Sequence, residues 1–142
     1  MTNTGLRQLD RSLASTKEWL GDVREDLHFE QEEDAYQALR AVLHVLRDRL
    51  SVEQAADLAA QMPLMISGVY YDGWRPAGKP VKIRSTEEFI SMVAENLPES
   101  RRQDALRITK GVLRTVGKHV TKGEMDDVKS NMPESLRELF TG

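Results

Sequence analysis

The feature that most constrains the fold of this chain is an internal repeat with an offset of about seventy residues and no gaps. The sequence of residues 15–20, Ser-Thr-Lys-Glu-Trp-Leu, is similar to that of residues 85–90, Ser-Thr-Glu-Glu-Phe-Ile. Later pairs of positions seventy residues apart are often identical or share a similar side chain. Identical pairs include Asp34-Ala35 with Asp104-Ala105, Val42-Leu43 with Val112-Leu113, Asp57 with Asp127, and Met62-Pro63 with Met132-Pro133. A register held over roughly fifty-five positions predicts two copies of one structural unit.

Both copies have the apolar spacing of helices. Ser15 with Glu18, and Ser85 with Glu88, fit the capping box that starts a helix. The apolar stripe of the first copy also continues backwards through Leu6, Leu9 and Leu13, so an alternative start lies nearer the N-terminus.

A second helix is expected in each copy, over residues 33–50 and 102–120. A third helix is expected to begin at another cap in each copy. These caps are Ser51 with Gln54 and Thr121 with Glu124. Pro63 and Pro133 end those helices and open a short fourth one in each copy.

The predicted fold is therefore all-α, an internally duplicated helical bundle of two pseudo-symmetric units with three to four helices each. We expect a single domain over residues 1–142, with repeats at about 15–70 and 85–140 that bury their apolar faces together. An interlobe loop, residues 71–84, joins them and is rich in glycine and proline.

Composition limits the chemistry. The 142 residues include no cysteine, which excludes disulfide scaffolds, thiolate metal sites and thiol nucleophiles. No apolar run approaches a membrane span, and the N-terminus lacks the apolar core of a secretion signal, so we expect a cytoplasmic protein without membrane contact.

Several short motifs fall in a distinctive order: residues 36–50, Gln61-Met62-Pro63-Leu64, Tyr70-Tyr71-Asp72-Gly73-Trp74 and Thr86-Glu87-Glu88-Phe89. Together they resemble the bacterial family called domain of unknown function 2267, over about residues 9–139. The resemblance implies a soluble, helical bacterial protein with no established activity, and it supplies no catalytic residues.

The interlobe loop is the first candidate site, because specialised chemistry should lie where the two copies differ. Tyr71, Trp74 and Arg75 could form an aromatic and cationic wall for an anionic or planar ligand. His44 could join them in a site at the seam, although an edge or partly buried position is its simplest interpretation. In the alternative interpretation, Trp74 and Tyr71 fold back and plug the seam between the units.

A basic stripe on the helix of residues 102–120 is the second candidate, as a polyanion-binding face. It consists of Arg107, Lys110, Arg114 and Lys118. Residues 1–70 carry 7 basic and 12 acidic side chains (net -5), and residues 71–142 carry 13 and 11 (net +2). However, the whole chain has a net charge of -3 and no nucleic-acid motif, so a solvated helix face is the competing interpretation and we expect no nucleic-acid partner.

No metal or cofactor site is expected. Glu25 and His28 have the spacing of a di-metal carboxylate motif, but they lack the second pair that such a site needs. The three histidines have no nucleophile in a recognisable motif, and no catalytic residue is predicted.

The sequence favours a non-enzymatic binding module whose interlobe groove receives a protein segment or small ligand, and self-association fits its pseudo-symmetry. A small-molecule sensor or enzyme with a site at the seam is the alternative, and a polyanion binder is a third hypothesis.

Overall fold

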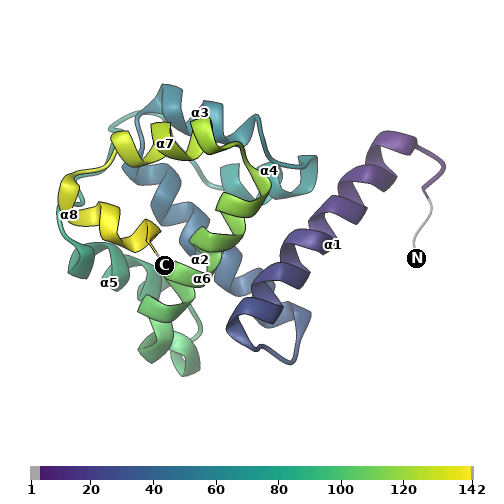
Figure 1. The fold of residues 1–142 in the computed structure, drawn as a ribbon, viewed down its shortest axis with the longest axis horizontal. Coiled ribbons are helices and arrows are strands. Elements are labelled where there is room, and N and C mark those ends of the chain that lie inside the picture. The colour runs from purple at the N-terminus through teal and green to yellow at the C-terminus, as the bar shows by residue number, and fades with distance from the viewer. Residues whose placement is uncertain (1–3, 142) are drawn as a thin grey trace.

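The computed structural model of the chain describes residues 4–141, which contain eight α-helices, two short 3-10 helices and no strand (Figure 1). The all-α prediction is confirmed. In chain order the elements are α1 Arg7–Leu27, α2 Glu32–Arg49, α3 Val52–Ala59, α4 Leu64–Tyr71, α5 Thr86–Asn96, η1 Glu99–Asp104, α6 Ala105–His119, α7 Lys122–Ser130, α8 Glu134–Arg137 and η2 Glu138–Phe140.

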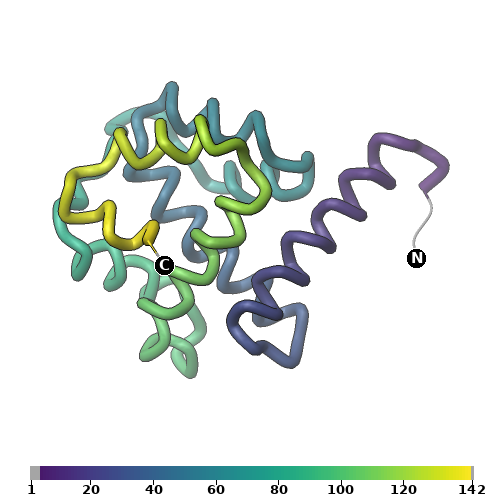
Figure 2. Tube along the Cα trace, in the orientation of Figure 1, coloured from purple at the N-terminus to yellow at the C-terminus, as the bar shows by residue number. Residues whose placement is uncertain are grey.

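Helix α2 lies at the centre and packs against α1, α4, α5 and α6, while α3 lies beside α7 (Figure 1). The C-terminal half of α1 packs along α2 and α6. Further toward the N-terminus α1 contacts α4, where the Met65 N–H donates to buried Ser12 Oγ (3.1 Å). Only the N-terminal end of α1 extends beyond the rest of the chain (Figure 2), and Leu6 and Leu9 are exposed there. The buried apolar side chains form one cluster, which includes Trp19, Leu39 and Val112.

The predicted cap at Ser15 is wrong. Helix α1 runs without a break from Arg7, as the apolar stripe through Leu9 and Leu13 indicated in the alternative. The residues before Ser15 include no proline and no glycine from Arg7 onward, so nothing local stops the helix there.

The other predicted caps are confirmed, because each serine or threonine oxygen accepts a bond from the backbone N–H three residues later. The pairs are Ser51 with Gln54 (3.2 Å), Ser85 with Glu88 (3.1 Å) and Thr121 with Glu124 (3.1 Å).

At two caps the other half of the box is replaced by bonds between α3 and α7. The backbone N–H of Ser51 donates to Asn131 Oδ1 (3.0 Å), and that of Thr121 donates to Gln61 Oε1 (2.8 Å). Each cap amide is therefore satisfied by a side chain from the other half of the chain.

The helix predicted over residues 102–120 begins later than expected. Pro98 precedes a 3-10 segment, η1, and α-helical geometry starts only at Ala105. Among residues 4–141, no helix is both long enough and apolar enough to cross a membrane.

Candidate functional site

Tyr71 and Trp74 are brought together at the start of the connector, which we define as residues 72–85. Their rings lie 5.4 Å apart at 49°, and the Trp74 backbone N–H donates to the Tyr71 carbonyl (2.9 Å). Both side chains are half-buried against the apolar core. The Trp74 Nε1 is buried without an acceptor in the part of the chain described. This arrangement favours the interpretation in which the two rings cover the core.

Arg75 and His44 do not join those rings. Arg75 is exposed and makes no hydrogen bond or ion pair within residues 4–141. His44 is buried in α2, and its Nε2 lies 2.7 Å from the Val69 carbonyl. Burial lowers the pKa of His44, and this effect outweighs the opposing bond to Val69. His44 therefore contributes to the packing of α4 on α2.

A buried cation, Arg47, holds the connector on α2. Arg47 is only 5% exposed, and its Nη1 donates to the carbonyls of Tyr70 (2.6 Å) and Asp72 (2.7 Å). Its Nε donates to Asp48 Oδ1 (3.1 Å). A buried guanidinium needs such partners, because an unpaired charge is costly away from water. Sequence reasoning missed Arg47, although it lies four residues after Leu43 on the inward stripe of its helix.

More bonds fasten the rest of the connector along the end of α2. The Val81 N–H donates to the Asp48 carbonyl (2.7 Å), and Arg49 Nε donates to the carbonyl of buried Ile83 (2.9 Å). Lys79 Nζ lies 3.8 Å from Asp48 Oδ1. The predicted interlobe loop is thus bonded to the first half of the chain over much of its length.

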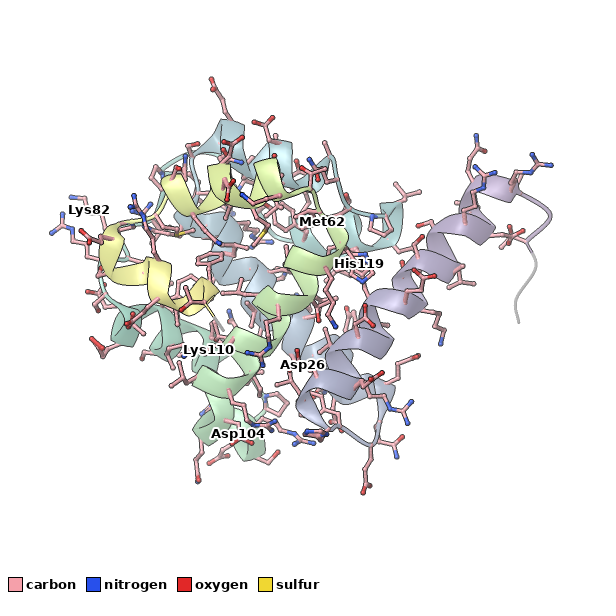
Figure 3. All side chains as sticks on the ribbon, viewed as in Figure 1. Asp26, Met62, Lys82, Asp104, Lys110 and His119 are labelled. Atoms are coloured by element: carbon pink, nitrogen blue, oxygen red, sulfur yellow. The ribbon has the colours of Figure 1, made fainter. Side chains whose placement is uncertain are left out.

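Two members of the basic stripe are bonded to α1. Arg114 donates twice to Asp26, from Nε (2.9 Å) and Nη2 (2.7 Å), and Arg107 Nη1 donates to the Leu27 carbonyl (3.0 Å). The hydrogen bond from Arg114 lowers the pKa of Asp26, and Asp26 in turn raises the pKa of Arg114. Figure 3 shows Asp26 where α1 faces α6.

The same boundary continues to the end of α6. Figure 3 shows His119 on the side of α6 that faces α1. Its Nε2 lies 2.7 Å from Asp22 Oδ2, and its ring stacks on Trp19 with centroids 4.8 Å apart. Lys118 lines a cavity of about 310 Å³ with Asp22, Glu25, Asp26 and His28. The basic stripe therefore complements the acidic face of α1, whereas Lys110 makes no hydrogen bond or ion pair within the described chain.

Glu25 and His28 share that cavity, yet among residues 4–141 no three His, Asp or Glu side chains are arranged so that they could hold a metal ion.

A separate depression, the α6–α7 pocket, was not predicted. It has a volume of about 370 Å³ and opens between α6, α7 and η2. Its apolar lining is Leu113, Gly117, Met125 and Phe140, and its polar lining is Arg114, Lys122, Asp126 and Lys129. The volume lies at the lower end of the range of roughly 300–1,000 Å³ that ligand pockets occupy.

The charges of the pocket are unequally paired. Lys122 Nζ lies 3.2 Å from Asp126, and Arg114 is bonded to Asp26 outside the pocket. Lys129 has no ion pair in the region that the structure covers. The pocket lining thus combines apolar residues with more basic than acidic side chains. Gly117, an exposed glycine inside an amphipathic helix, was the sequence signal that could have indicated it.

Comparison with known proteins gives one family. The family model described as "Uncharacterized conserved protein (DUF2267)" matches residues 16–139. A search of curated proteins found no match.

Proposed function

The chain belongs to the DUF2267 family, and on that premise we propose that it is a non-enzymatic interaction module that binds a segment of a partner protein in the cytoplasm. One observation carries the proposal: the α6–α7 pocket is lined by both apolar residues and three basic side chains. Because the rings of Tyr71 and Trp74 pack on the core, we place the binding surface at this pocket and not at the interlobe groove.

The proposal includes a single domain made of two related units, at about residues 15–70 and 85–140. Element bounds support it, since α3 and α7 begin at Val52 and Lys122, and α4 and α8 begin at Leu64 and Glu134, each pair seventy residues apart. Packing supports it too, because α1 packs on α6 as α5 packs on α2.

Hydrogen bonds between α3 and α7 support a two-fold relation of the units. Gln61 caps Thr121 while Asn131 caps Ser51, and the members of each pair differ by seventy positions from those of the other. Gln54 Nε2 donates to Glu124 Oε2 (2.6 Å), and these two positions are themselves equivalent. Equivalent residues meet only near an axis that relates the two copies.

A sensor at the interlobe seam is the second candidate, and the buried Trp74 Nε1 favours it. A ligand oxygen could accept from this donor, since buried N–H groups are normally paired. Carboxylate-bearing fragments that raise the melting temperature of the wild type, but not of Trp74→Phe, would support this candidate.

The proposal is tested by selecting displayed peptides on the wild-type protein and measuring their binding to Gly117→Arg. An added Cβ at Gly117 meets only Met125 Cε, at 3.9 Å, so the helix accepts the change while the arginine occupies the pocket. Gly68→Arg is the matched control, because Gly68 is an exposed helical glycine of α4 with open space around it.

At least a tenfold loss of affinity in Gly117→Arg and unchanged affinity in Gly68→Arg are expected. Peptides that bind all three proteins equally would refute the pocket as the binding surface.

A further inference from the structure

The α6–α7 pocket has an equivalent in the first unit, and that equivalent is filled. Position 117 is glycine where position 47 is the buried Arg47, and Phe140 is half-buried where Tyr70 is fully buried. The Tyr70 hydroxyl donates to the Ala55 carbonyl (2.9 Å). Replacing the guanidinium side chain by hydrogen removes the group that fills this place in the first unit.

The first unit also indicates what such a place accommodates. Arg47 binds the carbonyls of Tyr70 and Asp72, so the chain that leaves α4 lies over the end of α2. That stretch carries two aromatic rings, Tyr71 and Trp74, and a carboxylate, Asp72, whose Oδ2 lies 3.1 Å from Arg40. An irregular chain with aromatic and acidic side chains is therefore the occupant that this geometry receives.

The side chains of the second unit fit the same chemistry. Three basic residues, Arg114, Lys122 and Lys129, line the pocket with one carboxylate, Asp126. Met125 stands where the first unit has Ala55, and the flexible thioether adapts to varied apolar shapes. Complementary charge at a pocket rim gives specificity and speeds association.

From this comparison we propose that the α6–α7 pocket binds a partner segment in which an aromatic side chain is flanked by carboxylates. The aromatic ring enters between Met125 and Phe140, and the carboxylates meet Lys122 and Lys129. This inference rests on the proposed function and specifies its ligand.

The test uses fluorescence anisotropy with three labelled, acetylated pentapeptides: Glu-Glu-Trp-Glu-Glu, Lys-Lys-Trp-Lys-Lys and Glu-Glu-Ala-Glu-Glu. We expect saturable binding of the first to the wild-type chain and at least tenfold weaker binding of the other two. Lys122→Gln/Lys129→Gln should weaken the first peptide at least fivefold and reduce its dependence on salt. The matched control, Lys17→Gln/Lys82→Gln, removes two lysines outside the pocket lining and should bind like the wild type.

Each contrary outcome has a distinct meaning. In one outcome, the selected peptides lose affinity for Gly117→Arg, but the acidic tryptophan peptide binds the wild type no better than the basic peptide does. The inference then fails and the proposed function stands. If no peptide depends on Gly117, both fail. A single-stranded oligonucleotide that displaces the peptide in a manner dependent on Lys110 and Lys118 would overturn the inference in favour of polyanion binding.

Two checks keep the result interpretable. Helical circular dichroism of each variant must match the wild type. Lys129→Glu, an added surface variant, should abolish binding of the acidic peptide even if Gly117→Arg does not fold.

Discussion

Gly111 marks a close approach between α6 and α1. A Cβ added there would lie 2.5 Å from Leu27 Cδ2 and 2.7 Å from Leu27 Cγ, and Leu27 is only 1% exposed. The whole leucine side chain would have to move within a packed core. Seventy positions earlier the sequence has Ala41, which already carries a Cβ.

Gly111→Ala should therefore lower the free energy of unfolding by about 1–2 kcal/mol, because overpacking outweighs the gain of roughly 1 kcal/mol in helix propensity. Urea titration measures the change. Gly117→Ala on the same helix is the control, since its added Cβ has room, and it should stabilise by up to ~1 kcal/mol. Equal stabilisation by both substitutions would show that the Leu27 side chain moves aside without a cost in stability.

Arg47 is the second residue whose substitution should be costly. Arg47→Met keeps the length of the side chain but leaves the carbonyls of Tyr70 and Asp72 without their donor. We expect a loss of about 2–4 kcal/mol in the free energy of unfolding, since a buried and a part-buried acceptor both lose bonds to a charged group. Arg75→Met, at an exposed and unbonded position, should stay within about 0.5 kcal/mol. A similar small effect at both positions would show that Arg47 does not hold the connector on α2.

At the scale of the helices, the sequence predicted what depends on neighbouring residues and missed what depends on residues far away along the chain. Caps at Ser51, Ser85 and Thr121 follow from local spacing, and all three form. The bonds from Gln61 and Asn131 that complete two of them come from residues 60 and 80 positions away along the chain. Spacing within a helix carries no information about such distant partners.

The candidate sites also separate into those formed by neighbouring residues, which the sequence can predict, and those formed by distant residues, which it cannot. The contact between Tyr71 and Trp74 was within reach because the two residues are neighbours in sequence. The α6–α7 pocket could not be predicted, because its lining residues come from three elements. A pocket also depends on the absence of a side chain large enough to fill it, which sequence spacing does not reveal. The four residues of the basic stripe lie on α6, but spacing could not indicate that Arg107 and Arg114 bond to α1.

The attachment of α1 to α6 should depend on pH through Asp26. Because the bond from Arg114 lowers the pKa of Asp26 in the folded state, the pair stabilises the fold fully above the ordinary value near 4. That contribution is lost as the pH falls through the lowered pKa. Asp26→Asn should cost about 0.5–1 kcal/mol at pH 7, and the difference from wild type should disappear in acid.

Unfolding by urea at pH 7, 5, 4 and 3 measures this difference. Asp126→Asn is the control, because its pair with Lys122 is exposed and spans one helical turn, and it should cost at most about 0.5 kcal/mol. A cost for Asp26→Asn that stays constant from pH 7 to pH 3 would contradict the ion-pair explanation.

For the whole molecule, the contact between Gln54 and Glu124 tests whether the chain is built as two related units. Glu124 is 8% exposed, and burial, together with Asp57 and Asp127, raises its pKa in the folded state. An acid whose pKa is raised by folding binds its proton more tightly when folded, so its ionised form lowers stability above that pKa. Glu124→Gln should therefore stabilise the protein at pH 7, and the advantage should vanish as the pH falls below about 4. Thermal melts across this pH range measure the stabilisation. If Glu124→Gln destabilises the protein at pH 7, the ionised Glu124 does not lower the stability of the fold.

The converse substitution places like charges on the proposed two-fold axis. Gln54→Glu brings a second carboxylate to Glu124, whose Oε2 lies 2.6 Å from the Gln54 amide nitrogen. We expect a loss on the order of 1 kcal/mol at pH 7, recovered as the pH falls and one carboxylate takes up a proton. Gln54→Glu combined with Glu124→Gln restores one charge and one amide at the contact and should recover most of the stability. Glu53→Gln, one residue away on the exposed side of α3, should change little at any pH. If the double variant is no more stable than Gln54→Glu, positions 54 and 124 do not meet in solution, and the two-fold relation of the units loses its central contact.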